Sequence, residues 1–234
     1  MKSDYQVIII GSGFGGQLAA MNLNKKGIHD YIFLERREFM GGTWSQNTYP
    51  GAAVDVPSPL YSISSEPYDW SQLYAGQAEL QSYTEHLISK HKLKERTITE
   101  ANVRQIAWNE STTRCDISLE DGRHFTTQFI INATGPLSTP VIPDFPGKDK
   151  FKGASFHSND WDHSVDYANK RVAIIGSGAS AAQIIPTIAP EVAHLHILQR
   201  TPHWVIPRND RQFKTWPRAL LKNKGVNNSL RLLI

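Results

Sequence analysis

Two glycine-rich turns have the spacing that binds the phosphates of a dinucleotide. Residues 11–16 read Gly-Ser-Gly-Phe-Gly-Gly, and residues 176–181 read Gly-Ser-Gly-Ala-Ser-Ala. In the pattern G-x-G-x-x-[G/A], the first glycine allows a tight turn and the second lets a pyrophosphate approach the backbone. The third small residue lets a helix pack closely on a strand, and that helix offers unpaired N–H groups to phosphate oxygens. The candidate residues are Gly11, Gly13, Phe14 and Gly16 in the first turn, and Gly176, Gly178, Ser180 and Ala181 in the second.

Residues of opposite charge follow the two turns at the same distance. Glu35 lies 24 residues after Gly11, and Arg200 lies 24 residues after Gly176. A carboxylate at this position accepts from both ribose hydroxyls and favours FAD or NAD, whereas a guanidinium suits the 2′-phosphate of NADP. Thr201 adds a hydroxyl beside Arg200. Each turn could alternatively be a plain strand-to-helix connection with a surface charge, but two matched turns with complementary charges favour nucleotide binding.

The elements around the turns repeat. Apolar runs predict strands over 5–10 and 31–35, with a helix between them that ends near residue 26. The same order returns as a strand over 171–175, a helix over 180–188 and a strand over 192–199. Two such βαβ units predict an α/β fold with two Rossmann-like dinucleotide-binding units.

The segments between and after the two repeats divide into recognisable stretches. Residues 39–70 show neither strand nor helix period, which for so long a stretch indicates a functional excursion. We expect a helix over 79–93, short strands over 97–127 and a buried strand over 129–133, and the residues after 229 are helix-like. A proline-rich connector over 135–147 is the best candidate boundary. The expected domains are therefore 1–146, which binds the first dinucleotide, and 147–234, which holds a linker and the start of the second.

Composition excludes several classes of function. The formal net charge of +3 arises from 25 Lys and Arg against 22 Asp and Glu, which is too balanced for a nucleic-acid-binding surface. No stretch approaches the roughly 18 apolar residues that would span a membrane. The single cysteine, Cys115, cannot form a disulfide within the chain, which fits a cytoplasmic location. We expect no metal site.

The segment 151–162 between the two repeats carries a further motif. Its residues Phe151, Gly153, His157 and Trp161 resemble the fingerprint F-x-G-x-x-x-H-x-x-x-W-[P/D] of the Baeyer–Villiger monooxygenases, a family of class B flavin-containing monooxygenases. The related N- and S-oxygenating enzymes usually have another aromatic residue in place of Trp161. Alternatively, the aromatic residues of the segment belong to a core and His157 is a hydrogen-bonded hinge residue.

The resemblance extends along the chain and implies further contacts with FAD. Other matching segments are 41–44, 49–51, 133–135 and 200–203. By this similarity the residues expected at the FAD are Gly42, Thr43, Trp44, Asp55, Tyr61, Val103, Thr134 and Gly135. Asp55 is the implied catalytic residue, and without the resemblance it would be a loop-capping carboxylate. The chain departs from the family at Ala53, where an arginine is usual, and at Pro136, where a glutamine often stands.

The resemblance also implies a reaction. NADPH would reduce FAD, the reduced flavin would take up dioxygen, and the resulting peroxyflavin would insert oxygen into a ketone to give an ester or lactone. In the family the NADP unit is inserted in the FAD unit, and the chain corresponds to the amino-terminal part, so the C-terminal part, including a partner arginine for Asp55, is missing. The alternatives are an enzyme that oxygenates an amine or a sulfide, and a truncated, non-catalytic FAD- and NADP-binding remnant.

Overall fold

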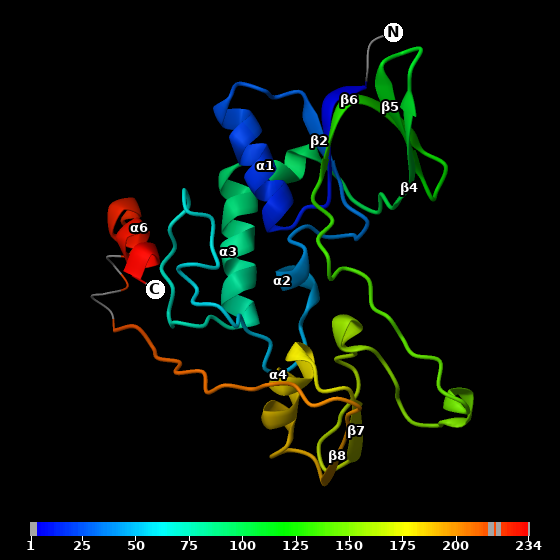
Figure 1. The fold of residues 1–234 in the computed structure, drawn as a ribbon, viewed down its shortest axis with the longest axis vertical. Helices are drawn as coiled ribbons and strands as arrows, with labels where there is room; N and C mark the ends of the chain where they lie inside the picture. Colours follow the sequence, from blue (N-terminus) through cyan, green and yellow to red (C-terminus); the bar gives the residue numbers. More distant parts are fainter. Residues whose placement is uncertain (1–3, 215–217, 219–220, 234) are drawn as a thin grey trace. The chain divides into compact units, whose positions relative to one another are not determined.

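The computed structural model describes residues 4–214, 218 and 221–233, which form two compact units (Figure 1). Unit 1 comprises Met1–Ser45 and Gln81–Ser138, and unit 2 comprises Gln46–Leu80 and Thr139–Ile234. Each unit contains one of the two glycine turns. Segment 46–80 therefore lies in the same unit as the second turn. The expected domain boundary instead places this segment in the first domain, because the resemblance implies that some of its residues contact FAD.

Unit 1 is built on a six-stranded sheet. Its strands are β1 (Tyr5–Ile10), β2 (Tyr31–Leu34), β3 (Thr97–Ile98), β4 (Val103–Asn109), β5 (Arg114–Leu119) and β6 (His124–Asn132), in the order β3-β2-β1-β6-β5-β4. Strands β3, β2, β1 and β6 run parallel, and β6, β5 and β4 run antiparallel. From β1 the chain continues to β2 on one side and later to β6 on the other. The strand order therefore reverses between β1 and β6, which is where open α/β sheets bind ligands.

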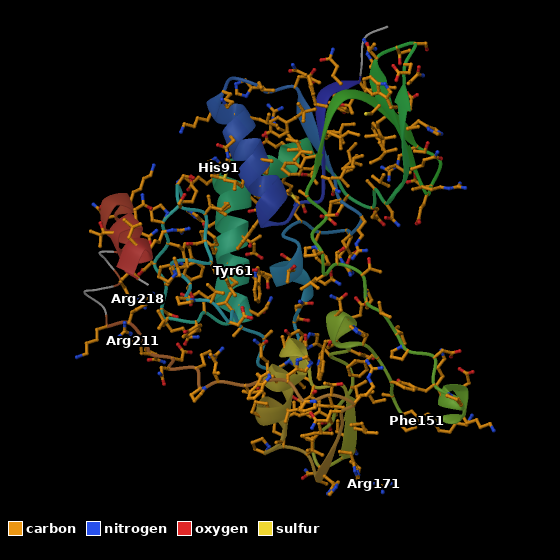
Figure 2. The ribbon with its side chains drawn as sticks, in the orientation of Figure 1. Tyr61, His91, Phe151, Arg171, Arg211 and Arg218 are labelled. Carbon is orange, nitrogen blue, oxygen red and sulfur yellow. The ribbon has the colours of Figure 1, made fainter. Side chains whose placement is uncertain are left out.

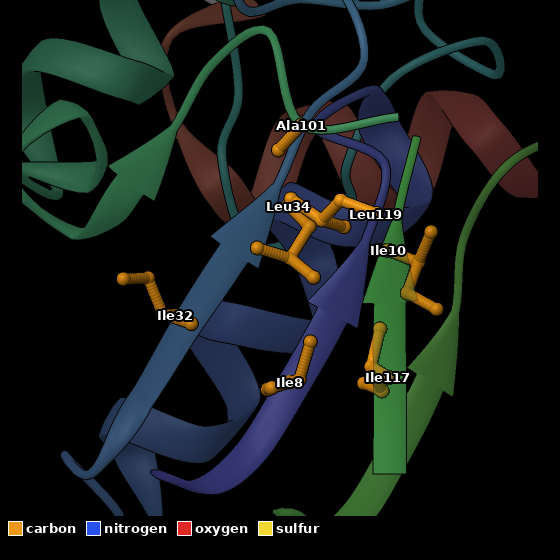
Figure 3. Packing of buried hydrophobic residues seen from close by; sticks show 7 residues of the cluster. All are labelled: Ile8, Ile10, Ile32, Leu34, Ala101, Ile117 and Leu119. Atoms are coloured by element: carbon orange, nitrogen blue, oxygen red, sulfur yellow. The ribbon is translucent and has the colours of Figure 1, made fainter. Parts of the chain in front are cut away.

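The central strand β1 is buried on both faces, as expected for a covered parallel sheet. On one face, Ile8 and Ile10 pack with Ile32, Leu34 and residues of β5 (Figure 3). On the other face, Val7 and Ile9 form a cluster with Ala20 of α1 (Phe14–Lys25). Alternate residues of one strand thus reach two cores, and the carboxyl end of β1 is fixed between them.

Unit 2 repeats the strand-turn-helix arrangement on a smaller scale. Parallel strands β7 (Arg171–Ile175) and β8 (His194–Leu198) flank α4 (Ala179–Ile188) in the sequence. Ile184 and Ile188 of α4 form a core cluster with Tyr49 and Ala52, and β7 and β8 pack against this cluster. The remaining helices are α2 (Thr43–Gln46), α3 (Gln77–Lys90), α6 (Lys224–Leu233) and the short 3-10 helices Leu93–Arg96, Lys148–Lys150 and Ser158–Asp160.

The close packing of α4 on Gly51 yields a prediction for stability. Gly51 has a φ of +79°, and a Cβ atom there would lie 2.3 Å from Thr187 Oγ1 and 2.6 Å from the carbonyl oxygen of Gln183. Gly51→Ala therefore adds both backbone strain and a collision with helix backbone. We expect it to destabilise unit 2 by about 2–4 kcal/mol in denaturant unfolding. Gly147→Ala is the matched control, because φ there is +84° but nothing lies within 4 Å of the added Cβ.

The observed elements confirm the α/β fold and the repeated Rossmann-like order. One strand differs from its expectation: β6 is a continuous strand from His124 to Asn132, and Phe129, expected to be buried, is 59% exposed. The prediction took the whole apolar run to be buried, but in the structure it is Ile130 and Ile131 that pack against the two core clusters, and both are only partly buried. Within the described residues, no helix is long and apolar enough to cross a membrane.

Candidate dinucleotide-binding sites

The first turn places an open helix end at the carboxyl edge of the unit 1 sheet. The N–H of Gly11 donates to the carbonyl of Leu34 over 2.9 Å, and φ at Gly11 is +95°. A Cβ on Gly11 would lie 2.6 Å from the carbonyl oxygen of Ala133, so only glycine fits. Helix α1 then begins at the cap residue Gly13. Because glycine has no side chain, it cannot cap the first N–H groups of the helix, which are the donors that a phosphate needs.

Glu35 is held at the end of β2 by this same turn. Both the N–H and the hydroxyl of Ser12 donate to its Oε2, over 2.9 and 2.6 Å. The N–H of Arg37 donates to Oε1 over 3.1 Å, and Glu35 is 7% exposed. These donors fix a nearly buried carboxylate next to the turn, where the sequence predicted a ribose contact. Ser12 was not among the predicted residues, although its place between two turn glycines could have indicated it.

A pocket of about 280 Å³ opens at the carboxyl ends of β1 and β6. Its lining residues are Ile10, Val103, Arg104, Gln105, Ile106, Asn132 and Thr134. Val103 and Thr134 were predicted as FAD contacts from positions distant in the sequence, and the structure brings them to one pocket. The pocket lies where the strand order reverses, so its location fits a bound nucleotide.

The remaining predicted residues of unit 1 lie near the first turn or after β6. The ring of Phe14 packs edge-on against Tyr83 with centroids 5.6 Å apart. Gly42, with φ +65°, approaches Gly13 so closely that a Cβ would lie 2.7 Å from the Gly13 Cα. Thr43 is exposed and Trp44 is buried. After β6, Asn132 accepts from the N–H and hydroxyl of Thr134, and Gly135 has a φ of +72°.

The second turn has the same backbone geometry as the first at its first two glycines. The N–H of Gly176 donates to the carbonyl of Leu198 over 2.8 Å, with φ +111° at Gly176. The cap residue Gly178 has φ −72° and ψ −174°, against −70° and −171° at Gly13. Ser180 is half-buried, and Ala181, at the third small position, is buried. Apart from the residues next to them in the chain, no described residue comes within 4 Å of a Cβ built on Gly176 or Gly178, so the backbone here is open to a ligand.

Arg200 and Thr201 follow β8 beside this turn. Both residues are exposed, and the hydroxyl of Ser177 donates to the carbonyl of Thr201 over 3.3 Å. Ser177 therefore contacts the backbone after β8, whereas Ser12 binds the side-chain carboxylate of Glu35. The two turns share their geometry and differ in the charge that follows them.

Asp55 and Tyr61 belong to unit 2. Asp55 is exposed, and Tyr61, which is labelled in Figure 2, is half-buried. The backbone before Asp55 forms hydrogen bonds with side chains from α4 and from segment 204–214. Within the described part of the chain, no hydrogen bond of the Asp55 carboxylate is found, so its loop-capping alternative is not supported. The residues that bind this loop, Gln183 and Arg208, were missed by sequence reasoning because nothing local marks them.

The fingerprint segment forms a structural link within unit 2. Nδ1 of His157 accepts from the N–H of Asn159 over 3.1 Å and so caps a 3-10 helix; the alternative expected a hydrogen-bonded hinge residue here, and only the hydrogen bond is observed. The ring of Trp161 packs edge-on against Phe156 and Tyr167, at centroid distances of 5.1 and 6.2 Å. Phe151 is 65% exposed, so the core alternative is wrong for this residue. Gly153 lies so close to the Phe151 ring that a Cβ would come within 2.6 Å of it.

The last residue of the motif, Asp162, forms a turn. Its Oδ1 accepts from the hydroxyl and the N–H of Ser164 over 2.6 and 2.9 Å. The Ser164 hydroxyl bond is the main reason that the pKa of Asp162 lies below its ordinary value. Asp162 thus ends the fingerprint segment as an ionised turn residue.

Fold and sites together define an α/β protein with two Rossmann-like units, each with its own glycine turn. Residues 5–231 match the model of the pyridine nucleotide-disulphide oxidoreductase family, and the chain belongs to that family. It is 45% identical over 227 residues to a Baeyer–Villiger monooxygenase of Streptomyces coelicolor, covering 97% of this chain and 44% of the relative. A Baeyer–Villiger monooxygenase of Pseudomonas aeruginosa is 41% identical, over 88% of this chain and 39% of the relative.

A solved structure shows the same likeness. The structure of OTEMO in complex with FAD and NADP matches with a TM-score of 0.89 and 30% identity, over 98% of this chain and 45% of that one. These comparisons confirm the resemblance that the fingerprint residues indicated. The chain spans less than half the length of the relatives that it matches.

Proposed function

We propose that the chain is a nucleotide-binding portion of an NADPH-dependent flavin monooxygenase of the Baeyer–Villiger type. The observation that carries this proposal is the pair of matching turns followed by opposite charges, Glu35 in unit 1 and Arg200 in unit 2. Two findings support the proposal: the relatives from Streptomyces coelicolor and Pseudomonas aeruginosa are named Baeyer–Villiger monooxygenases, and the OTEMO structure holds both FAD and NADP. The domain assignment that we propose is an FAD-binding domain over 1–146 and a linker with the start of an NADP-binding domain over 147–234.

The residues of unit 1 fit FAD. The turn from Gly11 to Gly16 would hold the pyrophosphate through its backbone N–H groups, and Glu35 would accept from the ribose hydroxyls. The pocket lined by Val103 and Thr134 lies at the same edge of the sheet and would take the adenine. Gly42, Thr43, Trp44 and Gly135 complete the proposed FAD contacts of this unit.

The residues of unit 2 fit NADPH. The open backbone at Gly176 and Gly178 leaves room for a second pyrophosphate. Arg200 is exposed and would form charge-assisted hydrogen bonds with the 2′-phosphate that distinguishes NADPH from NADH. The same turn contains Ser180 and Ala181, and Thr201 directly follows Arg200 after β8.

The proposed reaction converts a ketone, dioxygen, NADPH and a proton into an ester or lactone, NADP⁺ and water. When bound, FAD supplies the transfer of two electrons from NADPH to dioxygen. Asp55 is the proposed catalytic residue, because its exposed carboxylate stands at the end of a hydrogen-bonded loop and could accept a hydrogen bond from a reacting group and so orient it. Tyr61 would line the same region of unit 2.

The experiment that tests the reaction is product analysis in ¹⁸O₂. The chain, loaded with FAD, is incubated with NADPH and either cyclohexanone or a thioether, and the products are weighed by mass spectrometry. A lactone that gains one ¹⁸O atom supports the proposal. Formation of a sulfoxide without a lactone would indicate an enzyme of the sulfur-oxygenating class instead. A chain that binds FAD but forms no oxygenated product with NADPH would favour the non-catalytic remnant.

A further inference from the structure

We infer that Gln183 of α4 positions the loop that carries Asp55, and so connects the second nucleotide turn to the proposed catalytic carboxylate. The Asp55 loop is defined as residues 49–55. This inference rests on the proposed function for the role of Asp55, but the contacts that carry it are properties of unit 2 alone.

The Gln183 side chain makes three hydrogen bonds, all to the Asp55 loop. Its Oε1 accepts from the hydroxyl of Tyr49 over 3.1 Å and from the N–H of Ala53 over 3.3 Å. Its Nε2 donates to the carbonyl of Ala53 over 2.8 Å. One amide group therefore satisfies both backbone groups of Ala53, which is a pairing that a strand neighbour would normally provide.

Apolar packing holds the loop at the same place. Tyr49 and Ala52 share a buried cluster with Ile184 and Ile188, which belong to the same helix α4 as Gln183. Gly51 approaches the helix so closely that an added Cβ would collide with the carbonyl oxygen of Gln183. Hydrogen bonds and packing therefore bind the loop to the same part of α4.

The backbone on either side of Ala53 is also paired. The carbonyl of Ala52 accepts from the N–H of Gln77 over 2.8 Å, and the N–H of Val54 donates to the carbonyl of Ala75 over 3.1 Å. The carbonyl of Val54 accepts from the guanidinium of Arg208 over 3.3 Å. The chain is thus fixed up to the residue before Asp55, while the Asp55 side chain is exposed.

The position of Gln183 links this loop to the nucleotide turn. Gln183 lies five residues after the cap residue Gly178, which corresponds to about 7.5 Å along a helix axis. A ligand held by the first turn of α4 would restrict the helix on which Gln183 stands. Occupation of the turn is therefore expected to tighten the Asp55 loop.

Amide hydrogen exchange, resolved by NMR on the whole chain without ligand, tests the positioning role. Gln183→Leu removes all three bonds, and we expect the Ala53 amide to exchange roughly 10-fold faster or more. Gln183→Glu keeps an acceptor for the Ala53 N–H but places a carboxylate oxygen where Nε2 donates to the Ala53 carbonyl, so it should recover only part of the protection. Tyr49→Phe is the matched control, because it removes one bond to Gln183 and leaves both bonds to Ala53. Unchanged exchange in α4, followed at Ala189, shows that the helix is intact.

The same samples with NADP⁺ added separate this inference from the proposed function. We expect NADP⁺ to slow exchange over residues 49–55 in the original chain and to have a weaker effect there in Gln183→Leu. Equal exchange at Ala53 in the original chain and Gln183→Leu overturns the positioning role. Faster exchange in Gln183→Leu, in a chain that binds no NADP⁺, supports the positioning role and contradicts the proposed function of unit 2.

Discussion

Gly16→Ala is expected to abolish FAD retention and to destabilise unit 1 by about 3 kcal/mol. A Cβ at this position would lie 2.1 Å from the carbonyl oxygen of Gly11 and 3.2 Å from the Phe33 ring. The oxygen belongs to a turn that is itself packed against Ala133, so neither backbone can move away without opening the site. Thermal unfolding and flavin absorbance after removal of free FAD measure the two effects.

Gly15→Ala is the matched control for this prediction. It lies in the same helical turn, is exposed, and its Cβ would meet only the Ala133 Cβ at 3.7 Å, an ordinary contact. Alanine also favours a helix over glycine by up to about 1 kcal/mol, so Gly15→Ala should fold at least as well as the original chain. If both variants retained FAD and stability equally, the close packing of α1 on the turn would not be what shapes the site.

Arg200→Glu is expected to weaken binding of NADPH by at least about 100-fold and to leave binding of NADH nearly unchanged. The physical reason is the loss of a charge-assisted contact with the 2′-phosphate and its replacement by repulsion between two anions. Fluorescence titration of the reduced nucleotides measures both dissociation constants.

Arg171→Glu controls for the change in net charge. Arg171 is exposed and begins β7, whereas the turn follows the other end of that strand, about 16 Å away for five residues. The Arg171→Glu substitution should change the dissociation constants of NADPH and NADH only slightly and to the same extent. Equal losses of NADPH and NADH in Arg200→Glu would contradict the assignment of Arg200 to the 2′-phosphate.

Local patterns were sufficient to predict the two strand-turn-helix units. The apolar runs before Gly11 and Gly176 have lengths typical of buried strands, and glycines at that spacing directly after a strand are typical of dinucleotide-binding turns. The structure confirms the elements and shows equivalent backbone geometry at Gly13 and Gly178, the glycines that begin the two helices. Glu35 and Arg200 were found by counting from the turns, because a strand of similar length follows each helix.

Long-range pairing could not be predicted in the same way. The contact between Gln183 and Ala53 joins residues 130 positions apart, and neither residue belongs to a recognisable pattern. Segment 204–214 likewise returns to the 71–75 region, where the N–H of Leu73 donates to the carbonyl of Arg211. Such pairings satisfy backbone groups of an irregular segment, and the sequence shows only that the segment is irregular. For this reason the grouping of residues 46–80 with the second turn emerged from the structure alone.

The visible absorption spectrum of the chain, after addition of FAD and removal of the excess, tests the central claim most directly. We expect a retained flavin spectrum that bleaches when NADPH is added without oxygen, because unit 1 is proposed to hold the flavin and unit 2 to bind its reductant. A chain that is folded by circular dichroism yet retains no flavin would contradict the assignment of the Gly11 turn, Glu35 and the adjoining pocket to FAD.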